Sequence, residues 1–170
     1  MKKRFFASLL IILTLICGFP ALCAALSPVD GTTRVFVLVS PETALNVRLK
    51  PSIGSEKIGK AYLGYSLYTD GTKRNGFLHV VDCPYEYSEG WVRAEYVTYS
   101  EVEYVACEAT VTAKGRVACR EGAGGERKKW LKPGKTVNVY ATSDGWAITD
   151  EGYIKTDFLT LQGTSTTPGK

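Results

Sequence analysis

The sequence reads GWVRAEYV at residues 90–97 and GYIKTDFL at residues 152–159. Position by position, the two runs agree in character: glycine, aromatic, β-branched, basic, small, acidic, aromatic and aliphatic. Self-similarity of this kind indicates a repeated architecture, and it decides the fold before any single residue does. The sequence therefore predicts two copies of one small domain.

Further anchors precede each run in the same order. They pair residues 76–80 with 145–149, 64–67 with 134–137, and 46–48 with 118–120. Four anchors that recur in the same order are difficult to obtain by chance. We therefore place the first copy at residues 33–99 and the second copy at residues 104–161, joined by a short linker.

Each copy is expected to be all-β. Short alternating runs such as residues 77–81 suit half-buried strands, and no stretch shows the apolar repeat of a helix. Glycine-containing turn signals separate these runs, for example at Asp70-Gly71 and Asp144-Gly145. Because domains of about 60 residues bury only about 60% of their unfolded surface, we expect the two copies to pack on one another.

Both copies resemble the bacterial SH3 (SH3b) domains. The pattern of that family is an apolar-Asn-Val-Arg start, a loop rich in Pro and Gly, Gly-led strands, then Gly-Trp-Val and a Tyr-Leu ending. It is matched in copy one by residues 44–48, 51–52, 64, 76–77, 90–92 and 96–97, and in copy two by residues 117–120, 134, 145–146, 152–154 and 158–159. The resemblance implies an all-β fold of two tandem small SH3-like β-barrels.

Two loops depart from the family pattern. The interval between Gly76 and Gly90 is much longer than that between Gly145 and Gly152, so copy one carries an insertion around residues 82–89. Copy two has REGAGG from residue 120, where the family more often has Arg-Ser-Gly-Pro. Both departures fall in loops, where domains of this kind usually keep their specificity.

The N-terminal segment is typical of a secretory signal peptide. A basic start at residues 2–4 precedes an apolar run that ends in small residues, which is the order of a cleaved leader. We expect residues 1–25 to be removed and residues 26–32 to form a linker. An uncleaved anchor is the alternative, although the run reaches the roughly 20 residues of a bilayer span only by counting through Gly18 and Pro20.

The charge argues against nucleic acid as a partner. The formal net charge is +4, and loss of residues 2–4 with the leader lowers it to +1. Nucleic-acid binding needs clustered Lys and Arg, and the one local cluster, within residues 127–135, is typical of a solvated face. We expect a secreted, envelope-associated protein with a disordered tail at residues 162–170, in contact with a membrane only if the leader is retained.

No catalytic or metal site is visible in the sequence. A cysteine peptidase needs a Cys activated by a His, and the one histidine, His79, falls in a predicted strand at the position matched by Ile148. Zinc sites have close Cys or His pairs, whereas Cys83, Cys107 and Cys119 are widely spaced. We therefore expect a protein that is not an enzyme and that needs no cofactor.

The same cysteines are an odd set for an oxidising compartment. Cys119 matches Val47 of the first copy, so we expect it to be a small buried hydrophobe. A disulfide between Cys83 and Cys107 would join the inserted loop to the second copy. The spacing does not fix the connectivity, so this pairing is one arrangement among others.

Aromatic side chains are the candidate ligand-binding residues: Tyr65, Tyr85, Tyr87, Trp130 and Trp146. Tyr and Trp suit this task because they present a flat apolar face with one polar group. Tyr85 and Tyr87 lie in the inserted loop, where no demand of the fold explains them, and Trp130 follows a basic run. Packing of these rings on their own domain is the alternative interpretation.

The SH3b resemblance implies binding of cell-wall peptidoglycan through a groove lined by aromatic side chains. We therefore expect a non-catalytic extracytoplasmic protein that binds a peptide or polymer of the wall. The alternative is a cell-surface adaptor that docks a partner protein. An enzyme of unrecognised type is a third interpretation, which no recognisable catalytic residue supports.

Overall fold

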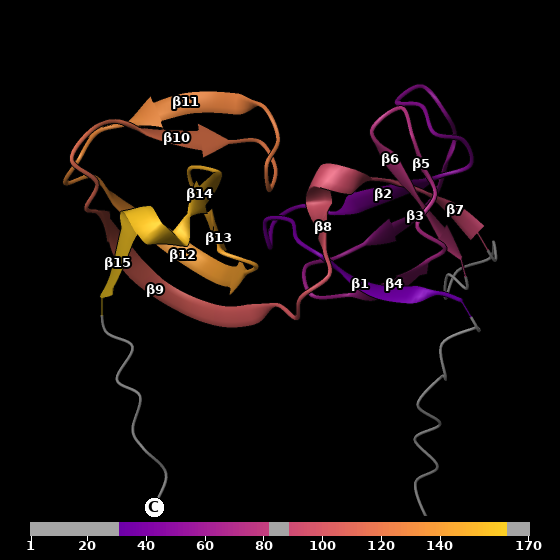
Figure 1. The fold of residues 1–170 in the computed structure, drawn as a ribbon, viewed down its shortest axis with the longest axis horizontal. Coiled ribbons are helices and arrows are strands. Elements are labelled where there is room, and N and C mark those ends of the chain that lie inside the picture. The colour runs from indigo at the N-terminus through magenta and orange to yellow at the C-terminus, as the bar shows by residue number, and fades with distance from the viewer. Residues whose placement is uncertain (1–30, 82–88, 163–170) are drawn as a thin grey trace, which may run out of the picture.

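The computed structural model describes residues 31–81 and 89–162. Apart from two short 3₁₀ helices, every regular element in these residues is a β-strand, and the strands form two antiparallel sheets, one after the other along the chain. Figure 1 shows the two sheets side by side, the first in indigo to pink and the second in rose-red to yellow. We call them the N-terminal unit and the C-terminal unit.

The N-terminal unit contains an 8-stranded sheet and one 3₁₀ helix. The strand order is β3-β2-β7-β6-β4-β1-β8, with β5 paired to β6. The bounds are β1 (Thr33–Val37), β2 (Leu45–Arg48), β3 (Lys57–Ala61), β4 (Ser66–Thr69), β5 (Lys73–Arg74), β6 (Phe77–Val81), β7 (Glu89–Arg93), η1 (Ala94–Tyr96) and β8 (Val97–Thr98).

The C-terminal unit contains a 7-stranded sheet with the order β11-β10-β14-β13-β12-β9-β15. This is the order of the N-terminal unit, strand for strand, without a counterpart of β5. The bounds are β9 (Glu103–Val111), β10 (Val117–Arg120), β11 (Arg127–Leu131), β12 (Thr136–Ser143), β13 (Trp146–Thr149), β14 (Tyr153–Lys155), η2 (Thr156–Phe158) and β15 (Leu159–Gln162).

Equivalent residues take equivalent partners in the two sheets. His79 pairs with Trp91 between β6 and β7, and Ile148 pairs with Tyr153 between β13 and β14. The predicted all-β fold with two tandem SH3-like units is thereby confirmed. The hydrogen-bonded ladders of the described residues do not close either sheet into a continuous barrel.

The same hairpin turn begins β6 and β13. Asn75 and Gly76 have φ angles of 52° and 76°, and Asp144 and Gly145 have φ angles of 48° and 71°. Asn-Gly and Asp-Gly pairs adopt this left-handed conformation at low cost, and the turn fits the twist of the flanking strands. These turns set the register of β6 and β13 and thus which of their side chains face outward.

Each unit has its own apolar core. Because side chains alternate across a strand, one face of each sheet is buried and the other remains available. Cys119 takes the place that Val47 has in the first unit and is fully buried, as the sequence predicts. The cores consist of Val35, Val37, Val39, Leu45, Val47, Ala61, Leu67, Leu78, Val80 and Val92, and of Ala109, Val111, Val117, Cys119, Leu131, Val137, Val139, Ala147 and Ile154.

A third apolar cluster joins the two units. Leu38 of the N-terminal unit lies against Ala141, Ile148 and Tyr153 of the C-terminal unit, and Tyr96 packs against this cluster. The Tyr153 hydroxyl donates a hydrogen bond to Leu38 O at 2.6 Å, and both residues are buried. The two units therefore pack on one another, as expected for domains of this size.

Close backbone approach accompanies the apolar contact. The Ala123 N–H donates to Glu95 O at 3.0 Å, across the interface. Beside it, a Cβ atom on Gly122 would lie 2.8 Å from Glu95 O, a distance that real Cβ atoms do not tolerate. Glycine at residue 122 thus lets the loop between β10 and β11 reach η1 of the other unit.

The chain ends lie mostly outside the described residues, and with them the predicted leader, most of the linker and most of the tail. β15 extends to Gln162, which the sequence predicts as the first residue of the tail. Its Nε2 donates to Thr110 Oγ1 at 2.6 Å, which ties the residue to β9. No helix within residues 31–81 and 89–162 is long and apolar enough to cross a membrane.

Candidate ligand-binding cleft

A cleft of about 690 Å³ lies where the two units meet. On the N-terminal unit it is lined by β2, the segment before β2, and the end of β7 with η1. On the C-terminal unit it is lined by the end of β10, by β11, and by the hairpin of β13 and β14. Its volume falls in the range of small-ligand sites, and neither unit forms it alone.

Two tyrosines form an aromatic wall of the cleft. Tyr96 ends η1 and Tyr153 begins β14, and their ring centroids lie 6.3 Å apart at an interplanar angle of 47°. Burial raises the pKa of the Tyr153 hydroxyl, whose proton is held by Leu38 O. Burial, followed by the nearby Glu95 carboxylate, raises the pKa of Tyr96. Both rings therefore stay neutral at physiological pH. Tyr96 is half-buried and offers an apolar face to the cleft, whereas Tyr153 is only 6% exposed and supports it from behind.

Arg48 and Arg93 form the basic side of the cleft on the N-terminal unit. Arg48 Nη1 donates to Ser55 O at 2.8 Å, which anchors the loop between β2 and β3. Arg93 Nε donates to Glu95 Oε1 at 3.0 Å, and this hydrogen bond raises the pKa of Arg93. Because a guanidinium group has five N–H donors, both side chains are held in place and keep donors for a ligand.

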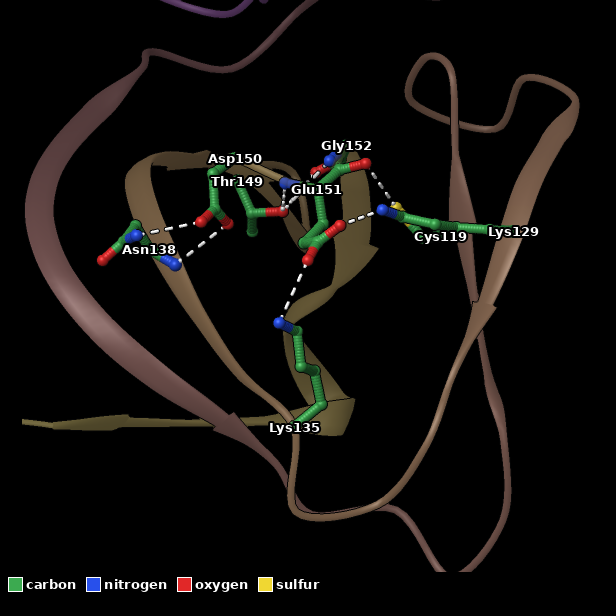
Figure 2. A network of polar contacts seen from close by, with 8 residues as sticks. All are labelled: Cys119, Lys129, Lys135, Asn138, Thr149, Asp150, Glu151 and Gly152. Atoms are coloured by element: carbon green, nitrogen blue, oxygen red, sulfur yellow. Dashed lines mark hydrogen bonds and ion pairs between the residues drawn. The ribbon is translucent and has the colours of Figure 1, made fainter.

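The turn between β13 and β14 forms the facing wall, and Figure 2 shows the polar contacts that hold it. Thr149 Oγ1 donates to Gly152 O at 2.7 Å, across the turn. The Asp150 carboxylate accepts hydrogen bonds from the backbone N–H of Asn138 at 3.1 Å and from its side-chain amide at 2.9 Å. The turn is thus fixed to β12, and its position does not depend on a ligand.

Glu151 anchors the outer side of the same turn. Figure 2 shows its carboxylate between the ammonium groups of Lys129 and Lys135, the second at 3.2 Å. These ion pairs take up part of the basic run that the sequence shows within residues 127–135. The Cys119 thiol donates to Glu151 O at 3.1 Å, and burial raises its pKa. A buried thiol of raised pKa is a poor nucleophile.

The lining of the cleft carries charges of both signs. Lys128 and Glu121 are exposed on the side of the cleft that the C-terminal unit forms. A ligand with a carboxylate, an ammonium group and amides along its length would find partners for each of them here. The charged lining residues are Arg48, Arg93, Arg120 and Lys128 on the basic side, and Glu95, Glu121 and Asp150 on the acidic side.

The aromatic residues that the sequence singles out lie elsewhere. Tyr65 is 50% exposed before β4 and packs edge-on against Tyr62. Trp130 is 49% exposed on β11, with the Arg127 guanidinium 4.7 Å from its ring centroid. Trp146 lines a separate shallow groove of the C-terminal unit. None of these three residues lines the cleft, so their role in ligand binding stays a prediction.

Three further predicted residues, Tyr85, Tyr87 and Cys83, lie outside the described residues. Cys107 is half-buried in β9 opposite Val139 and forms no disulfide within the part of the chain that the structure describes. The pairing of Cys83 with Cys107 therefore stays a prediction, as does a ligand-binding role of the inserted loop.

The cleft residues themselves were missed by the sequence interpretation. Arg48, Arg93 and Tyr96 all belong to the repeated pattern, where they read as scaffold. The signal that points to them is a mismatch between the copies. Ile148 is apolar where the first copy has His79 at the same position, as expected of a surface covered by a neighbour.

His79 has a structural environment in β6. Its Nδ1 donates to Asp70 Oδ2 at 2.9 Å, and its ring lies 4.7 Å from the ring of Trp91, centroid to centroid. Among residues 31–81 and 89–162, no group of three or more His, Cys, Asp or Glu side chains is placed to hold a metal ion. That the protein has no catalytic activity stays a prediction.

Comparison with known proteins gives structural likenesses at low sequence identity. No protein-family model matches the sequence, and no curated protein matches it. The chain is similar to NlpC1 from Trichomonas vaginalis, with 14% identity and a TM-score of 0.34 over 76% of this chain and 45% of that chain. NlpC2 from Trichomonas vaginalis gives 13% identity, a TM-score of 0.34, and 76% and 48% coverage.

A third solved structure, the endolysin LysPBC5 CBD, is 12% identical, with a TM-score of 0.29 over 77% of this chain and 94% of that chain. The chain spans less than half the length of the two NlpC chains. At TM-scores below 0.5, these likenesses decide neither the family nor the function.

Proposed function

We propose that this protein is a non-catalytic extracytoplasmic binding protein whose inter-unit cleft holds a peptide of the cell wall. The observation that carries the proposal is the cleft itself, with its neutral tyrosine wall and its lining charges of both signs. Stem peptides of peptidoglycan carry carboxylates, an amino group and amide bonds on a short chain, and each of these groups has a counterpart in the cleft.

Two further observations support the choice of this ligand class. The N-terminal segment is typical of export, which would bring the protein to the wall. The SH3b resemblance of both copies implies the same class of ligand. The walls of the cleft are held by hydrogen bonds of the protein itself, so little ordering is required when a ligand enters, and this favours binding.

The proposal is tested by retention of the leaderless protein on purified, protein-free peptidoglycan. We expect the protein to be retained. Lys128→Glu and Glu121→Lys should each weaken retention about threefold or more, because both exposed side chains line the cleft and would contact a charged ligand. Lys132→Glu and Glu108→Lys are matched controls, exposed on the C-terminal unit but not in the lining, and should leave retention unchanged.

The outcome also separates this proposal from the alternatives. Absence of retention at high protein concentration would contradict wall binding and favour a protein partner, for which exposed Trp130 with its stacked Arg127 is the best-placed surface. Retention that is lost with Trp130→Ala or Tyr85→Ala, and unaffected by the cleft variants, would place the ligand on the aromatic residues that the sequence predicts.

A further inference from the structure

A second, shallow groove of about 220 Å³ lies on the C-terminal unit. It is built from β10, β13, the end of β14 and η2, and all of its lining residues belong to this unit. Two of them are aromatic, Trp146 and Phe158, and two are basic, Arg120 and Lys155. No carboxylate lines the groove within the described residues, in contrast to the cleft between the units.

The N-terminal unit has an equivalent pair of residues, one aromatic and one basic, at the same place in its sheet. Phe77 pairs with Arg93 across β6 and β7, just as Trp146 pairs with Lys155 across β13 and β14. In the first unit the aromatic ring is not available, since Phe77 is only 2% exposed. Trp146 is half-buried and lines open space. Only the C-terminal unit therefore presents an aromatic face at this position.

The basic residue of the pair also differs between the units. Arg93 is bound by the Glu95 carboxylate, which neutralises it. Lys155 forms no ion pair in the part of the chain that the structure describes, and its ammonium group lies 4.5 Å from the centroid of the Trp146 ring. An exposed ammonium group over an indole ring keeps its hydrogen-bond donors for an anion.

We propose that this groove is a second ligand site, which takes the terminal carboxylate of a peptide. Lys155 and Arg120 would bind the carboxylate through charge-assisted hydrogen bonds, and the faces of Trp146 and Phe158 would cover the apolar part of the last residues. Trp146, Phe158 and Lys155 do not line the cleft, and Arg120 is the one residue of the groove that also does. The proposal therefore does not depend on whether the cleft binds a wall peptide.

The test follows the indole N–H signals of Trp91, Trp130 and Trp146 in ¹⁵N NMR spectra of the leaderless chain. The probes are N-acetylglycylglycine and its C-terminal amide, which differ only in the carboxylate. We expect the Trp146 signal to shift with the acid, and the amide to bind about tenfold more weakly or worse. Lys155→Gln should weaken binding of the acid to the same extent, and the matched variant Lys132→Gln should not.

Each other outcome overturns the proposal. Equal shifts with the acid and the amide would show that the carboxylate is not recognised. Absence of a Trp146 shift up to the solubility limit of the acid would show that the groove is not a site. Loss of the shift in Lys128→Glu would place the probe in the cleft instead. The Trp91 and Trp130 signals report whether each variant is folded.

Discussion

The outward faces of β6–β7 and β13–β14 have the same register and different surroundings. In the C-terminal unit this face carries Ile148 and Tyr153, both buried against Leu38 of the first unit. In the N-terminal unit the same positions carry His79 and Trp91, both only half-buried. One face has become an interface, and the other has remained a surface.

The difference teaches what the repeated pattern specifies and what it leaves free. Glycine turns and inward apolar residues are shared, because each sheet needs them to fold. The outward residues differ according to what covers them. Ile148 is apolar and buried against the other unit. His79, at the same position in the first unit, is polar and binds Asp70. Departures between the copies therefore mark the surfaces at which the two units differ in their surroundings.

The largest expected effect comes from removing the centre of the interface. Tyr153→Ala should lower the free energy of unfolding by about 3–5 kcal/mol, because a large buried side chain leaves a cavity. The equivalent Trp91→Ala should cost clearly less, since its ring is half-buried. Urea unfolding followed by circular dichroism measures both, and equal losses would show that burial against Leu38 adds nothing.

A smaller effect is expected where the backbones of the units approach. Gly122→Ala places a Cβ atom 2.8 Å from Glu95 O, so the units must shift apart, at about 1–3 kcal/mol of unfolding free energy. Gly54→Ala is the matched control, since a Cβ atom on this loop residue of the first unit meets nothing. Equal urea midpoints for the two variants would mean that the contact at residue 95 yields without cost.

Removal of one hydroxyl tests the polar part of the interface. Tyr153→Phe leaves Leu38 O buried without its donor, which should cost about 1–2 kcal/mol of unfolding free energy. Tyr104→Phe removes another hydrogen bond between the units, to Leu63 O, at an exposed position, and should cost less than about 0.5 kcal/mol. A larger loss for Tyr104→Phe than for Tyr153→Phe would refute this account of the interface.

The smallest effect concerns pH and the uncovered face. The hydrogen bond from His79 holds the pKa of Asp70 below its ordinary value of 3.8. A carboxylate with a lowered folded-state pKa stabilises the fold above that value, and the stabilisation is lost as the pH falls through the folded-state pKa. Because Asp70 is exposed to screening by solvent, Asp70→Asn should cost only about 0.3–0.5 kcal/mol at pH 7.

The same variant should cost nothing at strongly acidic pH, where Asp70 is protonated in both states. Urea unfolding at the two pH values measures the difference, and the exposed Asp157→Asn serves as the control. A destabilisation by Asp70→Asn that persists unchanged in acid would exclude the hydrogen bond between His79 and the Asp70 carboxylate as its cause.

The fold within each unit was within reach of the sequence. The aligned segments 76–80 and 145–149 place His79 opposite Ile148, and the strand register of the structure places them at the same position. This works because local features, an Asn-Gly or Asp-Gly turn and a Gly-aromatic strand start, determine the register. The burial of Cys119 followed from the same alignment. The domain limits and the Cys83–Cys107 pairing remain predictions.

The cleft was not within reach, because it depends on how the two units are placed. Its tyrosine wall forms because the Tyr153 hydroxyl binds Leu38 O of the other unit. These two residues are far apart in the sequence, and an alignment of the two copies does not predict a contact between them. Trp146, which has an open face, is one of the five aromatic residues that the sequence predicts as ligand-binding. Trp146 is distinguished by the exposed ammonium group of Lys155, which lies over its ring. The equivalent residue of the first unit, Arg93, is bound by Glu95.

The interface between the units joins two unlike surfaces, and this has a consequence for assembly. A contact of this heterologous kind can in principle be repeated from copy to copy into an open filament. Here the surface of each unit that faces away from the interface differs from the surface that forms it. In the N-terminal unit, His79 with its charged partner replaces Ile148. In the C-terminal unit, the exposed Thr112 replaces Leu38. These residues act as caps, as in repeat proteins with polar terminal faces, and we expect the series to stop at two units.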